Sequence, residues 1–210
     1  MKNILGIFMA LILFSCGNKE DILLPKSNVT IVNNVVDHSP IYIFFRTQGK
    51  DTLAEVNKKN EIISTNWIFN IDKRLPLRLV IPEVIKLQEK KRGEVAHKNE
   101  KAENYFSYAD SIGKNMAFLP FTKVYYTIGE PAGGVTIIRF EKGNDLVLVD
   151  DEKVQKKELV SYIYSIAHII QPRIFLVFDK NMSYEEYIQT KILVRKFDSY
   201  NDEVPREFIF

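Results

Sequence analysis

The chain has 210 residues, of which 46% are hydrophobic and 27% are charged, and its formal net charge is +2. This apolar content is typical of a globular protein and argues against intrinsic disorder. The balanced charge gives no reason to expect nucleic acid as a partner. The sequence has one cysteine, which excludes an internal disulfide framework.

The N-terminus has the pattern of a short export signal. A lysine precedes an apolar run at residues 4–14, which is shorter than the ~20 residues that a transmembrane helix needs. The run ends in Leu13-Phe14-Ser15-Cys16, which resembles the lipobox of bacterial lipoproteins. The resemblance implies a signal peptide at residues 1–15, lipid on Cys16 and anchoring in the outer membrane. An ordinary secretory signal with a chance cysteine is the alternative.

Residues 16–27 are predicted to be a polar tether between the lipid and the folded body. Within it, Lys19-Glu20-Asp21 is similar to the surface-export signal of Bacteroidota lipoproteins. That similarity implies a surface-exposed body, whereas an ordinary tether leaves the body facing the periplasm. Both placements remain open.

Residues 28–128 are predicted to form an N-terminal α+β region. Runs of β-branched and aromatic residues predict strands, and a polar turn at 48–51 predicts a hairpin. The strands are expected at residues 29–32, 41–45, 52–56, 67–71 and 122–128. A helix is expected to begin near Pro82, because proline is tolerated in a first turn but not in a helix interior. The charged stretch 89–103 is expected to lie in solvent.

Residues 129–134 are rich in glycine and are predicted to link this region to a second α+β domain at 135–210. A hairpin is expected at 135–149, a helix at 155–171 and a buried central strand at 174–178. Ser183 and Glu186 match a capping box that opens a helix at 184–197, and Lys191 and Arg195 are expected on its solvent face. The predicted fold class is α+β, with hairpins, a central strand and helices on one face of the sheet.

The order of these elements, with Phe178-Asp179-Lys180-Asn181-Met182-Ser183-Tyr184 at the turn, resembles the periplasmic domain of ExbD/TolR-type proteins. Residues 187–189 and 199–207 also resemble the long C-terminal helices of Bacteroidota members. The resemblance covers residues 134–210. It implies a non-catalytic domain that pairs with itself and binds a protein or cell-wall partner. The run at 4–14 carries no acid, so proton conduction is not implied.

The two regions of the chain contain one pair of similar segments. Residues 68–76 parallel residues 175–183, each reading as a strand, an Asp-Lys pair and a helix start. Two related halves would explain this, with the first lacking the helix predicted at 155–171. Chance similarity between two turns is the alternative.

The sequence offers no recognisable catalytic, cofactor or metal site. His38, His97 and His168 lack metal-ligand spacing, and the acidic run 150–152 lacks the alternation of a calcium loop. The leading hypothesis is therefore a non-enzymatic envelope lipoprotein that binds a protein or glycan, as an accessory to an ExbD/TolR-type system. The alternative is an envelope hydrolase, for which Asp72, Asp179 and His168 are the candidate groups.

Overall fold

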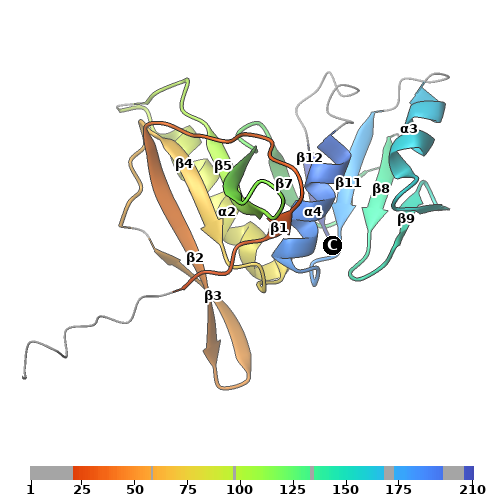
Figure 1. Cartoon of the computed structure of the whole chain (residues 1–210), viewed down its shortest axis with the longest axis horizontal. Helices are drawn as coiled ribbons and strands as arrows, with labels where there is room; N and C mark the ends of the chain where they lie inside the picture. The colour runs from red at the N-terminus through yellow and green to blue at the C-terminus, as the bar shows by residue number, and fades with distance from the viewer. Residues whose placement is uncertain (1–20, 58, 97, 133–134, 168–172, 196–205) are drawn as a thin grey trace, which may run out of the picture.

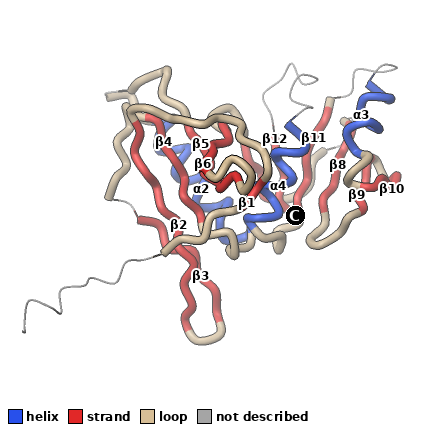
Figure 2. Tube along the Cα trace, viewed as in Figure 1, coloured by secondary structure: helices blue, strands red, loops and turns tan. Residues whose placement is uncertain are grey.

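The structure is a computed structural model that describes residues 21–57, 59–96, 98–132, 135–167, 173–195 and 206–210. This part of the chain contains three helices and twelve strands, and the strands form two mixed sheets. The fold class is α+β, as predicted. Figure 1 shows the two sheets on either side of α4, and Figure 2 separates helices from strands in the same view.

The first sheet has the order β1-β5-β4-β2-β3, and β6 also pairs with β5. Its strands are β1 (Lys26–Ser27), β2 (His38–Gln48), β3 (Asp51–Asn57), β4 (Asn66–Ile71), β5 (Asn104–Asp110) and β6 (Asn115–Pro120). The predicted strands at 41–45, 52–56 and 67–71 are confirmed. The hairpin between β2 and β3 turns at Gly49, whose φ of 62° suits a residue without a side chain, and it projects from the body (Figure 1).

The predicted strand at 29–32 is wrong. In this segment only Val32 pairs, through an isolated bridge to Phe118. The segment instead crosses the sheet, where Val32 packs on the apolar cluster of Val35, Ile68 and Phe118. Ile31 and Val32 therefore pack against the apolar clusters without forming a strand, whereas Val29 is exposed.

Helix α2 (Leu77–Gly93) begins five residues before the predicted position and contains Pro82 in its interior. The amides of Leu77 and Arg78 have partners elsewhere in the chain, since they donate to the carbonyls of Met182 (3.0 Å) and Lys180 (2.8 Å). These bonds satisfy two of the free N–H groups that open any helix. Tertiary contacts thus override the local signal of the proline.

The second sheet has the order β10-β9-β8-β11-β12-β7. Its strands are β7 (Tyr125–Ile128), β8 (Thr136–Phe140), β9 (Leu146–Val149), β10 (Glu152–Gln155), β11 (Ile174–Phe178) and β12 (Arg206–Ile209). The predicted hairpin and the central position of β11 are confirmed. Strand β7 precedes the expected linker at 129–134, yet it pairs with β12. The chain therefore passes from one sheet to the other before that linker.

Two helices belong to this half, α3 (Leu159–Ala167) and α4 (Tyr184–Val194). Helix α3 starts later than predicted because residues 152–155 form β10, and residues 168–171 lie outside the described residues. The Oγ of Ser183 accepts from the amide of Glu186 (3.2 Å), so this half of the predicted capping box is confirmed. The carboxylate of Glu186 instead accepts from the amide of Gly143 (3.0 Å). At the C-terminus, residues 206–209 form a strand and not the end of a helix.

The two halves share one plan. In each, an antiparallel hairpin is followed by a strand parallel to its first arm, a helix and a further parallel strand. Thus β3-β2-β4-β5 with α2 corresponds to β9-β8-β11-β12 with α4. The register pairs Ile71 with Ile43 and Phe178 with Phe140, which aligns Asp72 with Asp179. This correspondence agrees with the sequence similarity of residues 68–76 to residues 175–183. Helix α3 occurs in the second half only.

The helix starts of the two halves are joined reciprocally. The amides of Tyr184 and Glu185 donate to the carbonyls of Leu75 (2.8 Å) and Lys73 (3.1 Å). Under the alignment above, these bonds are the counterparts of those that Leu77 and Arg78 make to the second half. Each helix therefore has its opening amides satisfied by the turn of the other half.

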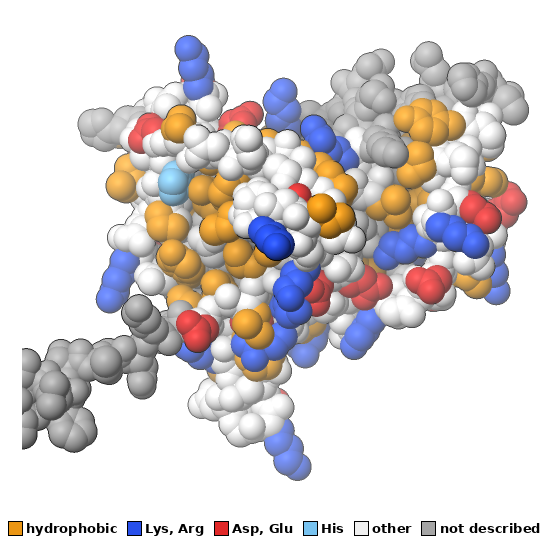
Figure 3. Space-filling model, in the orientation of Figure 1, with side chains coloured by type: hydrophobic (Ala, Val, Ile, Leu, Met, Phe, Trp, Pro, Cys, Tyr) orange, Lys and Arg blue, Asp and Glu red, His pale blue; other side chains and the backbone are white. Residues whose placement is uncertain are grey.

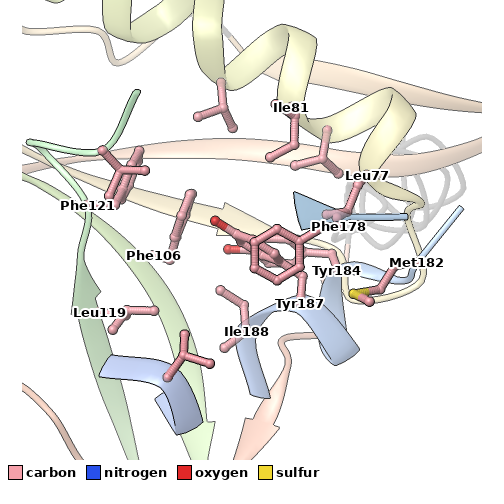
Figure 4. Packing of buried hydrophobic residues seen from close by; sticks show 14 of the residues in the cluster. Leu77, Ile81, Phe106, Leu119, Phe121, Phe178, Met182, Tyr184, Tyr187 and Ile188 are labelled. Carbon is pink, nitrogen blue, oxygen red and sulfur yellow. The ribbon is translucent and has the colours of Figure 1, made fainter. Parts of the chain in front are cut away.

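A single apolar core runs through this joint. Tyr187 of α4 lies edge-on to Phe106 of β5, with ring centroids 6.2 Å apart, and to Phe178 of β11, at 5.0 Å. Figure 4 shows the two tyrosines of α4, Tyr184 and Tyr187, between Phe106 and Phe178. Because side chains of both halves share this core, the halves pack as one body.

Candidate functional site

The strongest candidate site is a cleft of about 330 Å³ between α4 and the segment that joins β6 to β7. Its size lies at the lower end of the range for ligand pockets, about 300–1,000 Å³. We refer to it as the junction cleft, and its lining consists of Glu103, Leu119, Pro120, Phe121, Thr122, Lys123, Val124, Lys191 and Arg195.

One wall of the junction cleft is irregular backbone that α2 holds in place. The Nε2 of Gln88 lies 3.3 Å from the carbonyls of both Phe121 and Val124. Arg92 donates to the carbonyls of Thr122 (2.8 Å) and Val124 (3.0 Å). Because side chains from a helix satisfy these carbonyls, the wall is fixed although it belongs to no strand.

Lys191, at the floor of the cleft, is the end of a buried polar chain that continues behind it. Lys191 of α4 forms an ion pair with Glu207 of β12, and their side chains are 9% and 1% exposed. The hydroxyl of Tyr187 donates to Oε2 of Glu207 (2.7 Å), and the hydroxyl of Tyr126 lies 3.1 Å from that of Tyr187. We call these four residues the tyrosine–glutamate–lysine chain.

Burial sets the charge state of the two phenols in this chain. It raises the pKa of Tyr187 well above the usual value, and the nearby negative charge of Glu207 raises it further. The pKa of Tyr126 is raised well above its usual value by the same two causes, in the same order. Both phenols therefore keep their protons, and Tyr187 acts as a hydrogen-bond donor that fixes the glutamate.

The first half lacks such a chain. By the alignment of the two halves, Tyr187, Lys191 and Glu207 correspond to Val80, Val84 and Phe106, which are all buried. The shared plan is therefore built with apolar residues in one half and with an ion pair in the other. Since burying an ion pair costs free energy that apolar side chains do not, folding alone gives no reason for the chain.

The two aspartates nominated from the sequence lie in the turns that follow β4 and β11. Asp72 is paired with Arg74, and its Oδ1 accepts from the amide of Arg74 (3.0 Å). Burial alone would raise the pKa of Asp72, but the hydrogen bonds from Arg74 and Leu23 outweigh it, so the pKa is lowered. Asp179 likewise accepts from the amide of Asn181 (2.7 Å). Each carboxylate stabilises its own turn, and neither lines the junction cleft.

Of the other residues considered from the sequence, those that the structure describes do not line the junction cleft. His38 is the first residue of β2, and its Nδ1 lies 2.8 Å from the carbonyl of Val35. In the acidic run, Asp150 accepts from the amide of Ile137 (2.7 Å). Among the described residues, no group of three His, Cys, Asp or Glu side chains could hold a metal ion. His97, His168 and Cys16 lie outside the described residues.

Sequence reasoning missed the two charged residues at the floor of the cleft. Lys191 was expected in solvent, but it is buried. The signal was its position, because Tyr184, Tyr187, Ile188 and Lys191 fall on one face at helical spacing. Glu207 was expected at the end of a helix, and its burial depends on a parallel pairing with β11 and β7 that its local sequence does not indicate.

Comparison with protein-family models, with curated proteins and with solved structures gives no match to this chain. The lipoprotein and ExbD/TolR resemblances therefore remain proposals. No described helix has both the length and the apolar composition needed to cross a membrane.

Proposed function

We propose that this chain is a non-enzymatic envelope lipoprotein, anchored in the outer membrane through lipid on Cys16, whose body binds a protein or glycan partner. The observation that carries the binding role is the junction cleft with its charged floor. Its lining combines apolar residues on a fixed backbone with charged residues, and one of these is a lysine in an ion pair that the first half does not have. Such a combination of apolar walls with a few placed polar groups is typical of ligand sites.

The element order of the second half supports one class of partner. Hairpin, helix, strand, Asp-Lys turn and helix follow one another from β8 to α4, which is the order on which the ExbD/TolR resemblance rests. We therefore propose that the protein is an accessory to an envelope energy-transduction or transport system. Pairing with a second copy of itself is part of the same proposal.

The anchor is tested by membrane fractionation of the full-length chain with and without Cys16→Ser. We expect the unchanged chain to incorporate labelled fatty acid and to be released from membranes by detergent but not by salt, because several acyl chains hold it. Cys16→Ser should take up no label and leave the membrane fraction. Ser15→Ala, next to the modified residue, is the matched control and should behave as the unchanged chain. A labelled Cys16→Ser protein would contradict the anchor.

The binding role is tested by capture of partners from detergent-solubilised envelope on the immobilised full chain. The informative variant reverses charge at the rim of the junction cleft, Lys123→Glu with Arg195→Glu. The control reverses two exposed charges elsewhere, Lys114→Glu with Lys153→Glu. We expect the native chain and the control to enrich the same protein or glycan and the cleft variant to lose it. Equal capture by both variants would contradict a role for the cleft.

A further inference from the structure

The junction cleft combines an apolar wall with a cationic floor, and this deepens the proposed binding function. Leu119, Phe121 and Val124 supply the apolar wall. Lys191 and Arg195 are four residues apart on α4, so both side chains lie on one face of the helix. The site therefore offers two positive groups at one end and hydrocarbon at the other.

The charge count limits the ligand to a monoanion. Three cations, Lys123, Lys191 and Arg195, line the cleft, and they face the acids Glu103, in the lining, and Glu207, behind Lys191. One positive charge is therefore left over. A phosphate dianion would exceed it and would lie close to two carboxylates, whereas one carboxylate balances it.

The tyrosine–glutamate–lysine chain positions the lysine for this task. Glu207 accepts a hydrogen bond from Tyr187 and pairs with the ammonium of Lys191, which is one of the residues that line the cleft. The first half has Val84 and Phe106 at the equivalent positions, so the ion pair occurs only in the second half, whose α4 forms one side of the cleft. A few charged groups in fixed positions beside apolar lining residues are characteristic of ligand sites.

We propose that the junction cleft binds a carboxylate on an apolar residue, and specifically the C-terminal residue of a peptide, with Lys191 and Arg195 holding the carboxylate. Arg195 donates from the rim and Lys191 from the floor. The apolar side chain of the same residue packs on Leu119, Phe121 and Val124. A free carboxylic acid shares the headgroup chemistry and is separated from a peptide by the experiment below.

The test is calorimetric titration of the full chain in detergent with acetyl-Ala-Leu as the free acid, because its C-terminal leucine carries both the carboxylate and the apolar side chain. The same dipeptide as its C-terminal amide, propionate, and inorganic phosphate are titrated in parallel. We expect the acid to bind, the amide to bind at least about tenfold more weakly, since it lacks the charge, and propionate and phosphate to bind more weakly still. Equal binding of acid and amide, or tighter binding of propionate or phosphate, would overturn the proposal.

The decisive variant places the first half's own residues in the second half, Lys191→Val with Glu207→Phe. Removing the lysine alone would leave Glu207 buried without a partner and could unfold the chain. The double variant removes both charges, so we expect it to keep the circular dichroism spectrum of the native chain and to lose binding of the acid. A folded double variant that still binds the acid would overturn the proposal.

A milder variant guards against a double variant that does not fold. Arg195→Ala changes an exposed residue, and we expect it to weaken binding of the acid about tenfold. Lys153→Ala, on β10, is the matched control and should bind as the native chain does. An Arg195→Ala protein with native affinity would contradict the assigned role.

This inference rests on the proposed binding function, but the two fail in different ways. If the free acid does not bind but the charge-reversed cleft variant loses the envelope partner, the carboxylate site is wrong and the proposed binding function stands. If acetyl-Ala-Leu binds as described but the envelope yields no partner, the carboxylate site stands and the proposed envelope partner is wrong.

Discussion

A single lysine ties the end of α2 to the first sheet. The Nζ of Lys91 donates to the carbonyls of Thr65 (2.9 Å) and Glu103 (3.2 Å) and to Oδ1 of Asn104 (2.9 Å). It also lies 4.9 Å from the ring centroid of Trp67. All three donors of the ammonium are used, so this residue holds the end of the helix against two segments, residues 65–67 and 103–104.

Stability should depend on the protonation of Lys91 in a defined direction. Burial lowers the pKa of Lys91 from 10.5 to about 8, against the attraction of Glu103. Between these values the unfolded chain holds the proton that the folded chain has lost, so the free energy of unfolding should rise with pH. Urea unfolding at pH 8, 9 and 10 checks this, with Lys91→Met as the reference that lacks the group. A native chain that loses stability relative to Lys91→Met over this range would contradict the prediction.

The sequence placed Lys91 in a solvated stretch, and the error has the same origin as the error at Lys191. A lysine stem can pack among apolar side chains while its ammonium finds acceptors. Whether acceptors are present depends on segments far along the chain, such as the carbonyl of Thr65 for Lys91. The local sequence shows that a residue is charged. It does not show whether the core contains a hydrogen-bond acceptor or an opposite charge for that residue.

Helix α2 retains a proline in its interior. Pro82 has no N–H to donate to the carbonyl one turn earlier, so the helix lacks a hydrogen bond there. The helix forms because the second half binds its first amides and because its buried face includes Leu77, Val80, Ile81 and Val84. Packing therefore outweighs the defect.

Replacing the interior proline should stabilise the protein. Pro82→Ala restores the missing donor, and we expect the free energy of unfolding to rise by about 1–2 kcal/mol, less than the full proline penalty because proline also stiffens the unfolded chain. Urea denaturation measures the change. Pro76→Ala, at the N-cap, restores no helical bond and should be neutral or slightly destabilising. A lower denaturation midpoint for Pro82→Ala would show that the ring itself packs favourably.

Elements that carry their own signal were predicted well. Strand β11 is a continuous apolar run, and the serine that opens α4 is a recognisable cap, so both were located from the sequence. Strand β10, the early start of α2 and the strand character of residues 206–209 were missed. Each depends on pairing or hydrogen bonding with a distant segment, which local periodicity does not contain.

At the scale of the molecule, charge is mixed over the surface. Figure 3 shows Lys and Arg side chains interspersed with Asp and Glu on the displayed face, with hydrophobic atoms gathered over the first sheet. Inside, the shared core and the reciprocal bonds between the helix starts connect the halves. The similarity of residues 68–76 to residues 175–183 indicated two similar units. It did not show that these units pack against each other through their helix starts.

One body should unfold in one step. Trp67, the only tryptophan, lies in the first half and reports its unfolding by fluorescence. Hydrogen exchange of the amides of α4 reports the second half. We expect both probes to give the same midpoint in urea, because loss of either half exposes the core of the other. Separate midpoints would show that the halves are independent domains.

The position of β7 has a consequence for the covalent chain. This strand precedes the connection to β8 in the chain. It is nevertheless hydrogen-bonded to β12, the last strand of the chain. A break in the backbone between β7 and β8 would leave an N-terminal fragment that ends in a strand of its partner's sheet. The two pieces would then remain associated through that strand and the helix joint, so the protein is suited to fragment complementation at this connection.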